Sequence, residues 1–282
     1  AMKNERVIHS GIMGIGLALH PDGSLLLADW EGGYPLDEKG AIWSADDPAG
    51  KGSTERLETA RLLASRSFQP SHLAHADQRV RLGAQLELAS RKAWPVFTEV
   101  LDDGKAPLLA KLHAIWGLGI GLRQGQTDDS QLQSHLADTD PEVQTQLLKV
   151  LGDAPAKVSE ANRKTITNLI ASKNLRIRFH AAITAGKIKL AGAEDALWTM
   201  ATQDAGDAWL RHAVVTGLSG ALSPDVLAKR LTDTTRNIRL ATVLALARQH
   251  SPLIQPALAD ADSAIVDEAA RAIHDDTGIP EA

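Results

Sequence analysis

The clearest hydrophobic pattern in the chain lies in residues 140–152, DPEVQTQLLKVLG. Its apolar residues recur at i, i+4, i+7 and i+8, the spacing of one helix face: Val143, Leu147, Val150 and Leu151. Asp140 stands at the N-cap, Pro141 at the first helical position, and Gly152 just past the expected end. A lone helix cannot bury such a stripe, so the pattern predicts neighbours of the same kind.

The same pattern returns along most of the chain. The residue after the first apolar anchor of each copy marks the register: Arg81, Lys111, Gln144, Arg178, Arg211, Arg239 and Asp267. Successive intervals are 30, 33, 34, 33, 28 and 28 residues. A second helix is predicted before each copy, over residues 55–66, 93–101, 130–137, 160–171, 193–202, 224–231 and 252–259. Such periods are typical of stacked helix pairs, so we expect a mainly α chain, an α-α superhelix of about seven pairs.

The first fifty residues follow a two-residue period instead. Residues 14–19 alternate apolar with small residues, a Pro and a Gly follow in the turn at 20–23, and residues 24–30 and 40–44 complete three short strands. Between the last two lies a loop rich in Gly and charge. We therefore expect a short antiparallel β segment with its linker in residues 1–52, a solenoid in 53–276, and a tail in 277–282 beyond which a longer chain continues.

Two sets of residues resemble known families. The form Asp-Pro-x-Val-x-x-x-Leu-x-x-x-Leu-Gly resembles HEAT or phycobilisome-lyase-type repeats, which implies a HEAT/armadillo-like solenoid. Residues 16–24, 29–30 and 39–43 resemble the closing blade of a sugar-dehydrogenase-like quinoprotein propeller. The string LHAIWGLG at 112–119 is similar to the helical domain of large bacterial "membrane-bound dehydrogenase" proteins, in which a propeller precedes the HEAT repeats and a cytochrome c domain follows.

This resemblance implies a non-catalytic scaffold or protein-interaction module that spaces the propeller and the cytochrome domain of a larger redox protein. Its partners would be proteins or neighbouring domains of the same parent chain, in a periplasmic or exported location. A rival interpretation makes the segment part of a quinone-dependent sugar or alcohol dehydrogenase, with His20, Asp29 and Trp30 around an open cleft. A propeller needs at least four blades and the chain has room for one. We therefore expect no catalytic residue and no cofactor in this segment.

Composition narrows the partners further. The chain has 30 Lys and Arg against 35 Asp and Glu, a net charge of −5, which argues against nucleic acid as the partner. No apolar run approaches the roughly 20 residues of a membrane span, so we expect no membrane insertion by this segment. Cys is absent. His113 and His180 hold equivalent places two repeats apart, roughly 20 Å by helix spacing, so we expect no shared metal ion.

One row of cations is the candidate interaction surface: Arg81, Lys111, Arg178, Arg211 and Arg239. On a concave face it would accept an acidic peptide or another domain. The alternative is that each cation pairs with a neighbouring carboxylate, such as Asp77, Asp207 or Asp233, and links repeats. Gln144 and Asp267 interrupt the row.

The chain also has six Trp residues. We expect Trp94, Trp198 and Trp209 to pack between units, with a hot spot for a protein partner as the alternative.

Overall fold

The structure is a computed structural model that describes residues 7, 10–30, 39–50, 52–203, 206–276 and 278–279. It forms two compact units, residues 1–87 and 88–282. The predicted fold class is confirmed, since helical repeats follow a short antiparallel sheet. The expected charged loop at 31–38, Lys51 of the linker and most of the tail lie outside the described residues. A domain boundary at residue 52 stays a prediction.

The sheet opens the first unit. Strands β1 (Gly14–Leu19), β2 (Leu25–Asp29) and β3 (Ala41–Ala45) lie in that order, and both pairings are antiparallel. Leu17 pairs with Leu27, which pairs with Trp43, so these three side chains share one face. The predicted turn between β1 and β2 contains Gly23 at a φ of 88°, a backbone conformation that favours glycine.

Two arginines attach the β1–β2 turn to the helices of the first unit. These helices are α1 (Thr54–Ser65), the 3₁₀ helix η1 (Pro70–Ala74) and α2 (Gln78–Ser90). Arg56 Nε donates to the carbonyl oxygen of Asp22 at 2.7 Å, and Arg79 Nη1 donates to that of His20 at 2.6 Å. The turn and the start of α2 are therefore held together by charged donors on backbone carbonyls.

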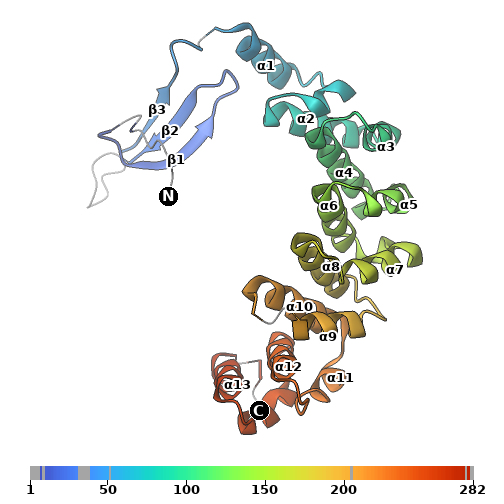
Figure 1. The fold of residues 1–282 in the computed structure, drawn as a ribbon. Coiled ribbons are helices and arrows are strands. Elements are labelled where there is room, and N and C mark those ends of the chain that lie inside the picture. The colour runs from blue at the N-terminus through green and yellow to red at the C-terminus, as the bar shows by residue number, and fades with distance from the viewer. Residues whose placement is uncertain are drawn as a thin grey trace. The chain divides into compact units, whose positions relative to one another are not determined.

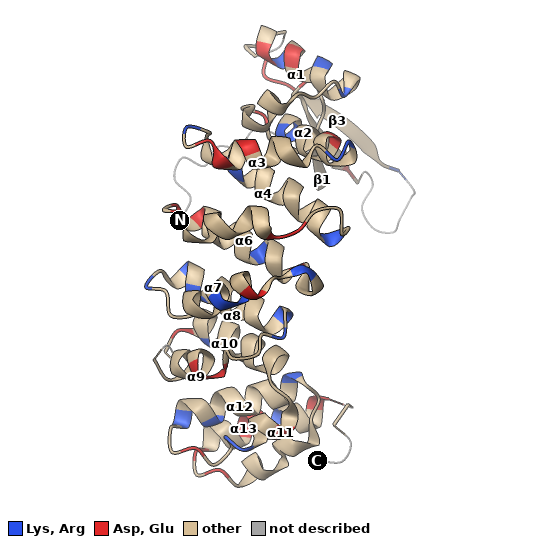
Figure 2. Ribbon diagram, turned by 90° about the vertical axis from the view of Figure 1, so that its right-hand side faces the viewer, with Lys and Arg blue, Asp and Glu red and all other residues tan. Residues whose placement is uncertain are grey.

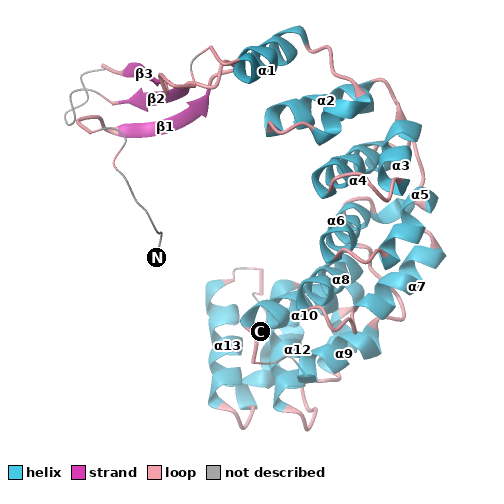
Figure 3. Cartoon of the chain, turned by 45° about the horizontal axis from the view of Figure 1, so that its top comes forward, coloured by secondary structure: helices cyan, strands magenta, loops and turns pink. Residues whose placement is uncertain are grey.

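The second unit is a stack of helices that alternate between two layers (Figures 1 and 3). The first layer contains α3 (Trp94–Asp102), α5 (Ser130–Gln133) with η2 (Ser134–Ala137), α7 (Glu160–Leu169), α9 (Glu194–Gln203), α11 (Pro224–Ala228) and η4 (Pro252–Ala259). The second layer contains α4 (Leu108–Arg123), α6 (Pro141–Gly152), α8 (Leu175–Lys187), α10 (Ala208–Ala221), α12 (Arg236–Arg248) and α13 (Ser263–Asp275). A short 3₁₀ turn, η3 (Pro155–Lys157), follows α6. Residues 252–259 form a 3₁₀ helix with Pro256 inside it, a residue that has no backbone N–H to donate.

The apolar stripe predicted for residues 140–152 is the buried face of α6. Its four members are at most 4 % exposed: Val143, Leu147, Val150 and Leu151. Asp140 caps the helix, accepting from the amide of Glu142 at 2.8 Å. Gly152 is the last residue of the helix rather than the residue beyond it. Thr145, Gln146 and Leu148 lie outside the stripe and are buried as well, so α6 has neighbours on more than one side.

Helices α8 and α10 approach each other through glycine. A Cβ added to Gly186 would lie 2.4 Å from the carbonyl oxygen of Thr216, and one on Gly220 would lie 2.3 Å from that of Gly186. One on Gly217 would lie 2.8 Å from the carbonyl oxygen of Ala182. We call these three glycines the glycine seam. It brings the backbones together toward the C-terminal ends of both helices, so the side chains that separate the helices lie toward their N-terminal ends.

The distribution of charge along the second unit is mixed, with Lys and Arg interspersed among Asp and Glu from α3 to α13 (Figure 2). Neither sign forms a continuous band along the described helices in this view. A binding surface on this unit must therefore be sought in local groups of side chains rather than in its overall charge.

Candidate functional site

The predicted row of cations occupies one structural position. Each member is the fourth residue of its helix, in α2, α4, α8, α10 and α12: Arg81, Lys111, Arg178, Arg211 and Arg239. Three of them donate to a carbonyl that follows the preceding helix of the pair: Arg81 to His75 (2.7 Å), Arg178 to Ser172 (2.9 Å) and Arg239 to Asp233 (2.9 Å). Carbonyls in the turn after a helix lie outside its hydrogen-bond pattern, so these guanidinium groups supply donors for them.

Gln144 interrupts the row of cations but occupies the same position, the fourth residue of its helix α6. Its Nε2 donates to the carbonyl oxygen of Leu136 at 2.8 Å, so a neutral amide makes the equivalent bond. Arg239 also pairs with Asp260, Nε to Oδ2, at 2.7 Å, which links it to the next repeat. In α13 the fourth residue is Val266, so Asp267 lies outside the row.

All five cations are buried or half-buried. A docking role for them stays a prediction. The alternative expects carboxylate partners in neighbouring repeats: Arg239 has one in Asp260, whereas Arg81 and Arg178 donate to carbonyls of their own helix pair.

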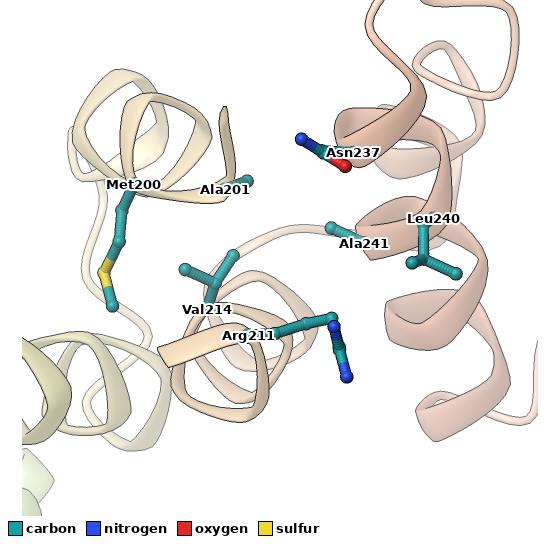
Figure 4. Close-up of a pocket in the computed structure, with 7 residues that line it drawn as sticks. All are labelled: Met200, Ala201, Arg211, Val214, Asn237, Leu240 and Ala241. Carbon is teal, nitrogen blue, oxygen red and sulfur yellow. The ribbon is translucent and has the colours of Figure 1, made fainter. Parts of the chain in front are cut away.

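Arg211 lies beside a small cavity between α9, α10 and α12 (Figure 4). The cavity has a volume of about 10 Å³ and is lined mainly by apolar side chains, including Met200, Val214 and Leu240. That volume holds at most about one water molecule. It is a packing defect between repeats and too small for an organic ligand.

A much larger hollow opens between the N-terminal halves of α8 and α10. Its volume is about 420 Å³, within the roughly 300–1,000 Å³ of small-molecule pockets. Seven residues line it: Leu175, Arg176, Phe179, His180, Asp207, Trp209 and Leu210. Trp209 is 75 % exposed and Leu175 is 52 % exposed. We call this feature the α8/α10 hollow.

Capping residues place the two side chains at its rim. Asn174 caps α8 by accepting from the amide of Arg176, and Asp207 caps α10 by accepting from the amide of Trp209 at 2.8 Å. Arg176 and Trp209 are thus the second residues of their helices, the position held by Glu142 in α6. The N-caps therefore place Trp209 at the position in α10 that is occupied by a charged residue in α6 and in α8.

Aromatic rings form the side of the hollow next to α8. Phe179 stacks on His212 of α10, with ring centroids 6.5 Å apart and planes inclined by 24°. Its ring also meets His180 edge-on at 5.0 Å. These contacts hold Phe179 against both helices, so this wall is preformed.

Polar side chains tie the three preceding second-layer helices to one another. Trp116 Nε1 donates to Gln146 Oε1 at 3.0 Å, and Gln146 Nε2 donates to Glu142 Oε1 at 2.5 Å. Arg176 then donates to Glu142 from Nε at 2.8 Å and from Nη2 at 3.0 Å. These hydrogen bonds extend to Arg176 at the hollow. They use Nε and Nη2 of its guanidinium and do not use Nη1.

Charge at the hollow is set by the same residues. Burial lowers the pKa of His180, and the nearby cations Arg176 and Lys149 lower it further. Burial raises the pKa of Glu142, but hydrogen bonds to its oxygens more than offset that effect and leave the pKa below its ordinary value. The bond to Glu142 raises the pKa of Arg176. At neutral pH the site therefore combines a neutral imidazole with an ionised Arg–Glu pair.

Asp29 and His20, which the dehydrogenase interpretation places around a cleft, make hydrogen bonds within the β-sheet and its turn. Asp29 is 7 % exposed, and its two oxygens accept from the amide of Met13 at 2.8 Å and from Trp43 Nε1 at 2.9 Å. His20 lies in the β1–β2 turn and pairs with Asp22 at 2.9 Å. The expectation that Asp29 faces an open cleft is wrong, because its carboxylate is packed and joins the chain before β1 to β3.

Two histidines at η1, His72 and His75, bind the local backbone. His72 and His75 each accept a backbone N–H through Nδ1, from Gln69 and Asp77 respectively, at 3.0 Å. Within the described part of the chain, no three His, Asp or Glu residues are grouped so that they could hold a metal ion. None of the described helices combines the length and the apolar character needed to cross a bilayer.

Sequence reasoning missed the exposure of Trp209. Trp94 and Trp198 are 9 % and 7 % exposed, as expected for packing between units, whereas Trp209 is 75 % exposed. The exposure of Trp209 could have been predicted from its position two residues after the N-cap, Asp207. The second residue of a helix in this register is Leu109 in α4, Glu142 in α6 and Arg176 in α8, each at least partly exposed, so a Trp at that place belongs to an outward-facing position.

The repeats are similar to known proteins. Residues 130–219 match the HEAT repeats family. This match covers the helices from α5 through most of α10, including both walls of the α8/α10 hollow. HEAT repeats are typical of scaffolds and protein-interaction modules, and their stacked helices present extended binding surfaces.

Solved structures include similar repeat proteins. An engineered protein from a structural genomics consortium has 18 % identity, covers 81 % of this chain and 71 % of its own, and gives a TM-score of 0.46. A second engineered protein has 18 % identity, coverages of 77 % and 96 %, and a TM-score of 0.36. A designed armadillo repeat protein in complex with the peptide (KR)4 has 15 % identity, coverages of 81 % and 95 %, and a TM-score of 0.34. No curated protein matches the chain.

Proposed function

We propose that this chain is a non-catalytic scaffold that binds protein through its HEAT repeats. The observation that carries this proposal is the α8/α10 hollow, an apolar depression with Trp209 exposed at its rim. A Trp in contact with water exposes a large apolar surface, and Trp is among the residues that dominate binding energy at protein interfaces. A protein partner that covers Trp209 and Leu175 would bury that surface.

In the parent protein, the module spaces a quinoprotein propeller and a cytochrome domain. Support comes from the blade-like residues at 16–24 and 39–43 and from the string at 112–119, which resemble the corresponding parts of bacterial membrane-bound dehydrogenases. The role is geometric: stacked repeats hold two neighbours at a fixed separation. Dehydrogenase activity would then reside in other parts of the parent protein.

The spacing role is testable because the chain has no Cys. Asp103→Cys and Ser263→Cys place two spin labels on exposed positions, at the end of α3 and the start of α13. Pulsed electron paramagnetic resonance should give one narrow distance distribution. A broad distribution would refute a stiff spacer. Added quinone with sugar or alcohol substrates should give no turnover, and measurable turnover would refute the non-catalytic assignment.

A further inference from the structure

The α8/α10 hollow combines an apolar floor with a charged rim, and this combination indicates the chemistry of its partner. Building on the proposed protein-interaction role, we infer that the hollow binds an extended acidic segment of a partner protein. One apolar side chain of that segment packs against Trp209 and Phe179, and a neighbouring carboxylate accepts from Arg176.

The hollow has the size and the preformed wall that an apolar side chain of a peptide needs. A volume of about 420 Å³ accommodates one or two side chains of a peptide. Phe179 is held between His180 and His212, so the wall does not have to be ordered when the peptide binds. Trp209 offers its ring at the rim, where it would close over an aliphatic or aromatic side chain.

Arg176 is the residue that would bind a carboxylate of the guest. Its bonds to Glu142 use Nε and Nη2, so Nη1 is the donor group that a partner's carboxylate would meet. His180, inside the hollow, experiences the positive charges of Arg176, Lys149 and Lys187 against the negative charge of Glu142. Lys187 is paired with Asp153 at 2.7 Å, so among the residues that line the hollow Arg176 is the cation that a carboxylate of the guest would approach. Asp207 also lines the hollow, but its Oδ1 accepts two amides at the N-terminus of α10, which offset its charge.

A basic or proline-rich segment is the competing occupant. A basic segment would place its charges beside Arg176, which is disfavoured by like-charge repulsion. A proline-rich segment would use the aromatic surface and make no use of the guanidinium. Selection among random peptides distinguishes the three kinds of guest by the residues that the enriched sequences share.

The test is phage display of random heptapeptides on the immobilised full chain, followed by fluorescence polarisation with the enriched peptides. Enriched sequences should place Asp or Glu next to a large apolar residue. Trp209→Ala and Arg176→Gln should each weaken binding about tenfold or more. Arg236→Gln is the matched control, because Arg236 also ties two second-layer helices through a carboxylate, Asp262, at 2.5 Å but does not line the hollow. It should change affinity by less than about twofold.

The outcomes separate this inference from the proposed function. Basic or proline-rich peptides that lose binding in Trp209→Ala would overturn the acidic guest and leave the interaction role intact. Acidic peptides that bind Trp209→Ala and the wild type equally would overturn the assignment to this hollow. If no peptide is enriched on the wild-type chain, this inference fails, while the proposed scaffold role is tested separately by the distance measurement on the spin-labelled chain. Far-ultraviolet circular dichroism of each variant checks that the helices remain folded.

Discussion

The glycine seam between α8 and α10 should not tolerate a single added methyl group. In Gly220→Ala the new Cβ would lie 2.3 Å from the carbonyl oxygen of Gly186 and 2.6 Å from its carbonyl carbon. Both are backbone atoms, which cannot rotate away as a side chain can. To restore ordinary contact, the two helices must separate by roughly 1 Å along most of their shared face.

The expected loss of stability follows from two opposing effects. Alanine is about 1 kcal/mol more favourable than glycine within a helix, which stabilises the variant. Overpacking a tight contact costs about 1–3 kcal/mol, and a clash with backbone belongs at or above the upper end of that range. We therefore expect Gly220→Ala to lower the free energy of opening of α8 and α10 by about 2 kcal/mol.

Hydrogen exchange measured by mass spectrometry is the suitable assay, because a chain of two units need not unfold in one step. Gly152→Ala is the matched control. Its nearest neighbours would be the side-chain atoms Lys187 Cδ at 3.1 Å and Thr184 Oγ1 at 3.3 Å, which need to move by only a few tenths of an ångström. The helix preference of alanine should therefore leave that variant close to neutral. If Gly220→Ala also leaves the exchange of α8 and α10 unchanged or slower, the seam does not determine the packing of these helices.

Two further predictions concern buried polar groups. Asp129→Ala should destabilise the α5–α7 region by about 3 kcal/mol. Asp129 Oδ2 accepts at 2.7 Å from both the amide of Ser159 and Nδ2 of the fully buried Asn162. In the variant the amide would lose this partner, and Nδ2 would keep the backbone carbonyl oxygen of residue 129 at 3.1 Å. Faster exchange confined to these segments is the expected readout, and wild-type exchange would contradict it. The hydrogen bond from Arg239 holds the pKa of Asp260 below its ordinary value of 3.8, so this pair stabilises the fold above that pH and loses its effect as the pH falls below it. The melting temperature of the C-terminal repeats should therefore fall on acidification below about pH 4. The fall should be smaller in Arg239→Met, which lacks the pair. An equal fall in the wild type and the variant would contradict the stabilising role of the Arg239–Asp260 pair.

Most of the helix pairs could be predicted from sequence because their signals are local. In α6, Asp140 at the cap and the apolar stripe starting at Val143 specify the helix, its start and its buried face. The sequence has Gly117, Gly119 and Gly121 at intervals of two residues, a pattern that does not by itself distinguish a helix end from a close contact. They lie inside α4, and a Cβ on Gly117 would meet the ring of Phe97 at 2.4 Å, so close packing is correct.

The roles of the polar residues could not be predicted in the same way. Arg81 and its equivalents fell at one repeated position, but the carbonyls they bind lie in turns whose path the sequence pattern does not specify. Arg176 and Glu142 are 34 residues apart, and their pairing depends on the angle at which α6 and α8 stack. The α8/α10 hollow likewise depends on the seam at one end of two helices and on bulky rings at the other.

The polar ties between repeats have a mechanical consequence. Arg176 with Glu142, and Lys187 with Asp153, each join residues 34 positions apart, so each of these ties connects one repeat to the next and neither reaches further. Such a stack responds to load as springs in series: the force is common to all junctions, and each junction bends according to its own stiffness. The junction between α8 and α10 has backbones in contact at one end and an open hollow at the other, so bending there widens or narrows the hollow. A guest in the hollow would stiffen that junction, and binding would thereby be coupled to the elasticity of the solenoid.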